Sequence, residues 1–227
     1  GVASYFAKHA YSNTELTDLL VELEEKSGRE LRSWSKLWLE TAGVNTLRPE
    51  IETDENGKIT SFAVIQTAIA EHPTLRPHRM AIGFYNLEGG QLKRVNRLEL
   101  DIDGPRTLVD QLVGIERPDL ILLNDDDLAY AKIRLDDISW NTALEHLSKF
   151  EDSLARTLIW GAAWDSTRDA EASPRDFVKL VLNNIATETE STTMLTLLRQ
   201  LVTAANFYVA EAHRKEIITE IGSGLLR

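Results

Sequence analysis

The spacing of apolar residues near the N-terminus predicts two helices. One stripe repeats at the i, i+3, i+4, i+7 spacing of a single helix face and consists of Leu16, Leu19, Leu20 and Leu23. It predicts a helix over residues 14–26, with Asn13 or Thr14 as its N-cap and Gly28 as its stop. A second stripe predicts a shorter helix over residues 30–40 and consists of Leu31, Trp34, Leu37 and Trp38. Apolar stripes of this size need a surface that covers them.

From Leu47 onward the apolar period changes from that of a helix to two residues, the period of a strand. Asn56-Gly57 lies between two such segments, and this dipeptide is the strongest short signal for a β-hairpin. Similar turn signals separate about seven strands, expected near residues 47–53, 59–68, 80–85, 91–102, 107–113, 120–123 and 131–135. Short strands joined by hairpin turns are typical of an antiparallel β-sandwich.

The segment from Pro118 to Asp137 joins two kinds of structure. Residues 120–123 form an unbroken apolar run, as expected for a strand that is buried on both faces. Four turn-forming residues follow, and then apolar and polar residues alternate through residues 131–135. The chain between Leu47 and this segment is predicted as strand, and the chain after it as helix.

After Asp137 the apolar pattern stays helical to the end of the chain. Ser173-Pro174 combines a good N-cap with proline at the first helical position, so it predicts the start of a helix. Thr192 or Thr193 is expected to begin the next helix, and a last one is expected to start near Glu211. Successive antiparallel helix pairs would form an all-α helical array.

Composition narrows the range of partners. The 227 residues are 43% hydrophobic and 27% charged, as in ordinary globular proteins. The net charge of −11 argues against nucleic acid or an anionic membrane, since both require basic patches. The absence of cysteine excludes disulfides and thiolate metal sites, and it agrees with a reducing, cytoplasmic compartment. Residue 1 is not Met and the chain opens within a helical pattern, so we expect a piece of a longer protein.

One acidic segment approaches the spacing of a calcium-binding loop. Its residues are Glu99, Asp101, Asp103, Gly104 and Asp110. Apolar residues alternate with these acids as far as Ile102, however, and Pro105 follows the glycine directly. The pattern therefore favours the solvent face of a strand over a calcium site.

The other candidate groups are equally weak. Asp125, Asp126 and Asp127 could hold a hard cation, but successive carboxylates point in different directions and acidic turns are usually solvated. No HExxH pair occurs among the five histidines, which are His9, His72, His78, His146 and His213. The tryptophans lie at helical spacing and are interpreted as core: Trp34, Trp38, Trp140, Trp160 and Trp164. The residues predict no catalytic, cofactor-binding or metal-binding site in this chain.

Two passages, residues 5–14 with 34–44 and residues 118–132, resemble the aminopeptidase N family of zinc metallo-aminopeptidases, most of all its bacterial members. The first is YFAKHAYSNT (residues 5–14) with WSKLWLETAGV (residues 34–44), which resembles the end of the family's catalytic domain. The second is PDLILLNDDDLAYAK (residues 118–132), which resembles the close of the small sandwich that precedes a C-terminal helical domain. This order agrees with the one read from the apolar pattern.

The resemblance implies three regions and a function. Residues 1–45 would be the helical tail of the catalytic domain, residues 46–136 a β-sandwich, and residues 137–227 the first part of an all-α domain. The family's HExxH zinc motif and its Gly-x-Met-Glu-Asn motif do not occur in this sequence, so no zinc ligand or substrate anchor is assigned here. We therefore expect the non-catalytic portion of a zinc aminopeptidase, inactive alone, whose zinc and peptide substrate are bound elsewhere in the parent.

Its expected partners are the missing catalytic domain and, through the exposed N-terminal helices, a second copy of the chain. The alternative is a free-standing interaction module of sandwich and helices without enzymatic activity. A reading frame that starts with Met near residue 1 would favour the module, whereas HExxH upstream would favour the aminopeptidase.

Overall fold

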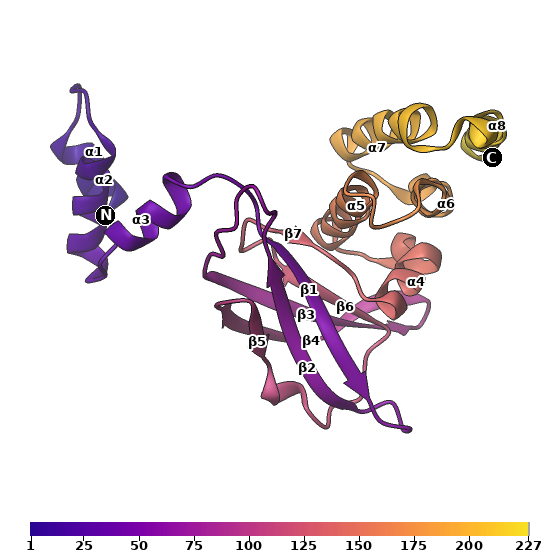
Figure 1. Ribbon diagram of the computed structural model, residues 1–227, viewed down its shortest axis with the longest axis horizontal. Coiled ribbons are helices and arrows are strands. Elements are labelled where there is room, and N and C mark those ends of the chain that lie inside the picture. Colours follow the sequence, from indigo (N-terminus) through magenta and orange to yellow (C-terminus); the bar gives the residue numbers. More distant parts are fainter. Residues whose placement is uncertain (227) are drawn as a thin grey trace.

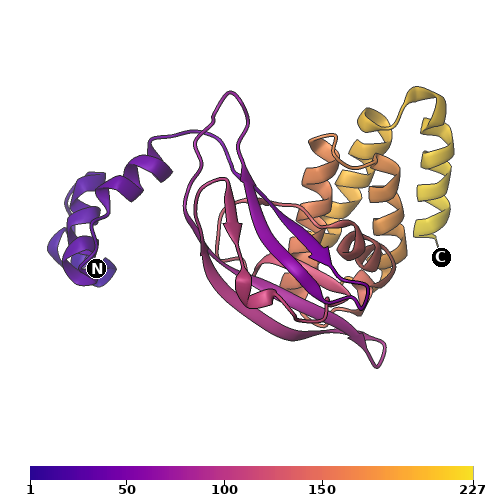
Figure 2. The ribbon, with the colours of Figure 1, turned by 60° about the horizontal axis from the view of Figure 1, so that its bottom comes forward.

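The computed structural model describes residues 1–226 and shows three parts in a row (Figure 1). A group of short helices stands at one end, a β-sandwich lies in the middle, and a layer of longer helices covers the far side of the sandwich (Figure 2). This mixed α and β architecture confirms the predicted fold class. No helix within the described residues is both long and apolar enough to cross a membrane.

The N-terminal group consists of three helices: α1 (Val2–Lys8), α2 (Leu16–Ser27) and α3 (Arg32–Leu39). The predicted stop of α2 is confirmed, because Gly28 adopts the left-handed conformation with φ 68°. The predicted N-cap was wrong. Glu15 takes that position and forms a capping box with Asp18, so a reciprocal pair of carboxylates replaces the expected Asn or Thr.

The sandwich consists of two sheets. One has the strand order β5-β2-β1-β7 and contains β1 (Thr46–Thr53), β2 (Ile59–Thr67), β5 (Arg106–Leu108) and β7 (Lys132–Ile133). The other has the order β4-β3-β6 and contains β3 (His78–Glu88), β4 (Gln91–Ile102) and β6 (Leu120–Asp125). The hairpins predicted from turn signals join β1 to β2 and β3 to β4.

Two details of the predicted sandwich need correction. The strand expected over residues 107–113 ends at Leu108, and a short 3₁₀-helix (Asp110–Leu112) follows it, burying Val109 and Leu112 instead of extending the sheet. The sheets are also not wholly antiparallel. β7 pairs with β1 in parallel over only two residues, and the chain then continues into α4.

Five helices follow: α4 (Asp137–His146), α5 (Ser153–Arg168), α6 (Pro174–Asn184), α7 (Ser191–Thr203) and α8 (Glu211–Leu225). Short 3₁₀ turns at residues 147–149 and 185–187 and a π-helical turn at residues 204–208 end α4, α6 and α7. The predicted start of α6 is confirmed, since Ser173 caps the helix and Pro174 is its first residue. α7 begins at Ser191 with Glu190 as N-cap, so the expected Thr192 or Thr193 start was slightly late.

The β4-β3-β6 sheet belongs to two cores at once. Ile121 and Leu123 of β6 pack inside the sandwich, whereas Leu120 and Leu122 pack under the helices with Phe177 and Leu201. This double burial explains the unbroken apolar run in the sequence. The predicted strand buried on both faces is thereby confirmed, and the helical layer is anchored directly on the sandwich.

One arginine hydrogen-bonds the end of the N-terminal helices to the sandwich. Arg76, only 4% exposed, precedes β3 and donates hydrogen bonds to the carbonyl oxygens of Leu37, Thr41, Ala42 and Gly43 at 2.9–3.0 Å. The Leu37 carbonyl lies in the last turn of α3, where a cation is favoured by the helix dipole, and the other three lie in the segment that follows the helix. A single side chain thus connects the end of α3 and the following segment to the sandwich.

Candidate functional site

The uncovered half of the β4-β3-β6 sheet carries a ladder of paired charges. Arg79 contacts both Glu99 and Asp101, at 2.9 and 3.2 Å, and Arg97 contacts Glu99 at 3.1 Å. Of the acids considered as calcium ligands at the sequence level, Glu99 and Asp101 therefore lie on β4, as the strand interpretation predicted, and arginines hold their carboxylates. Asp103 follows the strand, and Asp110 lies in the short 3₁₀-helix after β5. The hydrogen bond from Arg79 lowers the pKa of the Glu99 carboxyl below its ordinary value.

The aspartate cluster after β6 is also held by arginines. Asn124, Asp126 and Asp127 have positive φ, which bends the chain so that Asp125 turns inward and is 1% exposed. Its carboxylate accepts from the Tyr85 hydroxyl at 2.8 Å and from Arg94 at 2.9 Å. Burial and this hydrogen bond raise the pKa of Tyr85. These contacts of Asp125 with Tyr85 and Arg94 hold the turn against β3 and β4, and we call them the lock.

Gly83 makes room for that lock. A Cβ atom at this position of β3 would lie 2.2 Å from Oδ2 of Asp125, closer than any non-bonded contact allows. Glycine in the middle of a strand often marks such a close approach. The isolated glycine within the strand pattern is the sequence signal that could have indicated the buried aspartate.

The histidines do not form a metal centre. Within residues 1–226, no group of three or more His, Asp or Glu side chains is placed to hold a metal ion. His78 is the buried member, and it contacts Gln66 Oε1 through Nε2 at 3.0 Å and the Trp38 ring edge-on. Burial and the charge of Arg76 lower the pKa of His78 to about 4, so its imidazole is neutral.

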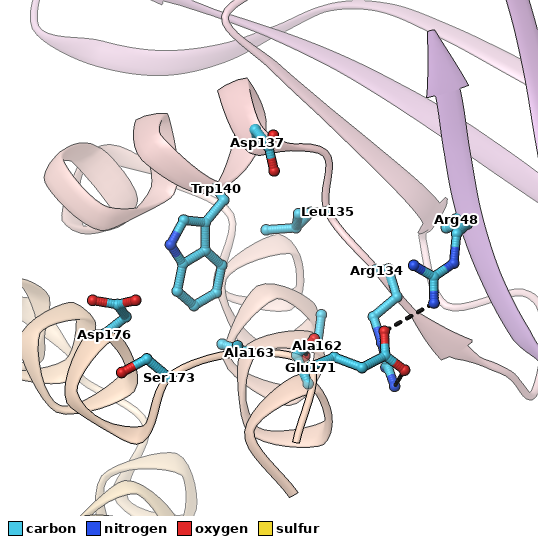
Figure 3. Close-up of a pocket in the computed structure, with 12 residues that line it drawn as sticks. Arg48, Arg134, Leu135, Asp137, Trp140, Ala162, Ala163, Glu171, Ser173 and Asp176 are labelled. Atoms are coloured by element: carbon cyan, nitrogen blue, oxygen red, sulfur yellow. Dashed lines mark hydrogen bonds and ion pairs between the residues drawn. The ribbon is translucent and has the colours of Figure 1, made fainter. Parts of the chain in front are cut away.

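A concave surface runs along the junction between β1 and the helical layer, and we call it the seam groove. It consists of two cavities of about 330 and 440 Å³ that share Arg48, Arg134, Leu135 and Asp137. Volumes of about 300–1,000 Å³ are usual for ligand sites. Figure 3 shows the first cavity, with Arg48 on β1 and Trp140 on α4 at opposite sides.

One end of the seam groove is closed by an ion-pair cluster. Arg134, 5% exposed, contacts Asp169 at 2.5 Å and Glu171 at 3.1 Å, and Arg48 contacts Glu171 at 2.8 Å. The hydrogen bond from Arg134 lowers the pKa of Glu171, and Arg48 adds to the effect. The cluster ties β1 and the segment directly after β7 to the loop between α5 and α6.

The remaining walls are apolar or carry carboxylates without cations. Trp140 and Leu135 stand beside Ala162 and Ala163 of α5 and form an apolar surface (Figure 3). Asp137 and Asp176 border this surface, and neither makes an ion pair within the described residues. Each lies in the first turn of a helix, where the dipole favours a negative charge.

Comparison with known proteins places the chain in a family. The family described as ERAP1-like C-terminal domain matches residues 120–226. Aminopeptidase N of Streptomyces lividans is 54% identical over 226 residues, which are 96% of this chain and 26% of that protein. The chain belongs to the aminopeptidase N family. It spans about a quarter of the length of this relative.

A solved aminopeptidase shares the fold. The crystal structure of Legionella pneumophila aminopeptidase A in complex with aspartic acid superposes with a TM-score of 0.52 at 15% sequence identity. The match covers 99% of this chain and 26% of that one. The succession of helices, sandwich and helical layer is therefore shared with an aminopeptidase.

Three residues that hold the fold together were not revealed by the sequence pattern. Arg76, Arg134 and Glu171 all act through contacts between residues more than thirty positions apart, such as Arg134 with Glu171 at a separation of 37. Of these three, only Arg76 had a local signal, because Pro77 follows it directly in the sequence.

Proposed function

We propose that this chain is the non-catalytic sandwich and helical portion of a zinc aminopeptidase that removes N-terminal residues from peptides. The 54% identity to aminopeptidase N, across almost the whole chain, carries the proposal. In this account residues 1–45 complete the catalytic domain, residues 46–136 form the sandwich, and residues 137–227 begin the helical domain. The sandwich spaces that helical domain from the catalytic zinc.

The residues of this chain do not fit a catalytic zinc site. Such a site needs about three protein ligands and an open position, and residues 1–226 hold no suitable cluster of His, Asp and Glu. Zinc would supply the activated water in the parent enzyme. The role of this chain is therefore to shape access to the catalytic region.

The surface of the N-terminal helices supports a missing partner. Phe6, Trp34 and Leu39 are 45–66% exposed, and large exposed apolar groups usually mark an interface. We assign this face to the catalytic domain of the parent, in the bacterial cytoplasm. The same face would drive self-association of the isolated chain.

The test compares this chain with the same reading frame extended to include HExxH. After dialysis, the 227-residue chain should hold no stoichiometric zinc and should not hydrolyse aminoacyl-anilides, whereas the extended protein should do both and lose activity with a chelator. Stoichiometric zinc and chelator-sensitive hydrolysis by the chain alone would contradict the proposal. So would an extended protein without activity.

A further inference from the structure

The free edge of β1 opens into the seam groove. β1 pairs with β2 along its full length on one side, but with β7 only at Thr46 and Leu47 on the other. The chain leaves this edge at Arg134, whose N–H donates to the Leu47 carbonyl at 2.9 Å. Beyond Leu47 the second edge of β1 has no neighbouring strand within the described residues.

The backbone groups on this edge follow from the alternation of a strand. The Leu47 carbonyl points toward β7, so the backbone groups of Pro49 and Ile51 point the same way. Pro49 has no N–H, but its carbonyl and both backbone groups of Ile51 make no hydrogen bond within residues 1–226. One donor and two acceptors are therefore available in a row. Such an edge is a template for another extended chain.

The seam groove lies along these groups. Pro49 and Ile51 line its larger cavity, and the segment from Leu135 to Ile138 forms the opposite wall. The smaller cavity continues from there to Trp140. An extended chain at the edge of β1 would thus lie between two walls and reach an apolar surface.

The charged side chains that line the seam groove favour a basic peptide. The arginines that line the groove are already paired, Arg48 and Arg134 with Glu171 and Arg117 with Asp136. The carboxylates of Asp137 and Asp176 have no such partner in the described structure and remain available to a cation. A basic side chain or an N-terminal ammonium complements them.

A second copy of this chain does not fit the edge. The β1 edge of another copy would lie inside its own groove, behind its own wall of residues 135–138, so two edges could not meet without opening both. A flexible peptide meets no such obstacle. We propose that the seam groove binds an extended basic peptide, which pairs with β1 at Pro49 and Ile51 and directs a cationic group toward Asp137 and Asp176. This is strand addition to an exposed sheet edge.

The experiment measures binding of a fluorescein-labelled octapeptide of alternating Lys and Val to the full chain by fluorescence anisotropy at low salt. Two control peptides carry Glu in place of Lys, or N-methyl groups on the amides that would face β1. We expect saturable binding of the Lys peptide, about tenfold weaker for either control. The attraction should also weaken in high salt.

Protein variants locate the site. Asp137→Asn combined with Asp176→Asn should weaken binding about fivefold to tenfold, while Asp110→Asn, an exposed carboxylate outside the groove, should leave it unchanged. Ile51→Pro removes the edge donor and should also weaken binding. If Ile51→Pro fails to fold, the N-methylated peptide tests the same hydrogen bonds without changing the protein.

Hydrogen exchange supplies the direct readout. The Ile51 amide should exchange more slowly when the Lys peptide saturates the chain. Unchanged exchange at Ile51, equal binding of the N-methylated peptide, or no saturable binding at about millimolar peptide would overturn the proposal. Because none of these readouts involves zinc or hydrolysis, failure here leaves the proposed function standing, and the reverse also holds.

Discussion

The helices before the sandwich and the helices after it contrast sharply in what they bury. In α1–α3 only Leu20, Glu22 and Ser35 are buried. In α4–α8, by contrast, every helix contributes to one continuous core, and Phe177 and Leu201 are fully covered. Both regions show the same kind of apolar stripe in the sequence. The stripe therefore predicts that a helix face will be covered, but not which part of a protein covers it.

The two groups of helices differ in how much apolar burial stabilises them. Burying one large apolar side chain contributes roughly 1.5–3 kcal/mol. The C-terminal helices gain this contribution within the chain, against β6 and against one another. The N-terminal helices leave Trp34 and Leu39 about half exposed, so their stripe stabilises little within residues 1–226.

The largest expected effect comes from truncating matched aromatic residues in the two regions. Phe177→Ala should reduce the free energy of unfolding by about 3–5 kcal/mol, because it leaves a cavity in the core under the helices. Trp34→Ala, at a side chain that is 45% exposed, should cost less than about 1 kcal/mol. Urea denaturation followed by circular dichroism measures both. Equal costs would remove the distinction between the regions.

The stability of the chain should depend on the protonation of His78, which contacts Trp38 of α3 where the N-terminal helices meet the sandwich. The pKa of His78 is about 4 in the folded chain, below its ordinary value of 6.5. The unfolded chain therefore binds the proton more readily between these values, and stability should fall as the pH drops from about 6.5 to about 4. The full loss is on the order of 3 kcal/mol. Below the folded pKa this contribution becomes constant.

Variants separate His78 from other acid-sensitive groups. His78→Gln should flatten this acid limb in urea denaturation at several pH values, since its side chain does not gain a charge. His213→Gln, at an exposed position on α8, should retain the limb. An unchanged slope in His78→Gln would show that the buried imidazole does not govern the acid response.

A smaller effect is expected at the lock between β3 and β6. Gly83→Ala should destabilise the chain by about 1–3 kcal/mol, because its Cβ would meet the Asp125 carboxylate at 2.2 Å. In an Asp125→Ala background the same change should cost less, because only the Tyr85 ring, whose Cε2 lies 2.8 Å from the added Cβ, still obstructs it. Additive costs in this double-mutant cycle would contradict the assigned contact.

Local patterns predicted the elements well, and tertiary contacts account for what they missed. The Asn56-Gly57 turn, the Gly28 stop and the Ser173-Pro174 start depend on backbone preferences that neighbouring residues set. Glu15 displaced better N-cap residues because Asp18 could return its hydrogen bond. The short parallel β7 and the inward turn of Asp125 follow from where distant strands meet.

The seam groove could not be predicted because its walls come from segments that lie far apart in the sequence. Arg48 lies on the first strand, whereas Glu171 follows the fifth helix, 123 positions later. Neither residue stands in a motif. Charged residues are usually exposed, so a sequence gives no reason to expect these two to be paired. Only the folded chain brings them into one cluster.

Hydrogen exchange along the chain tests most directly whether the N-terminal helices belong to a surface outside this unit. In the monomeric 227-residue chain, we expect the amides of α1–α3 to exchange fastest among the helical segments, and those of β6, α5 and α6 slowest. The chain that starts at Val44 should show the same slow amides. If α2 and α3 are protected as strongly as α5 and α6, the N-terminal helices form part of this unit's own core, and the account is contradicted.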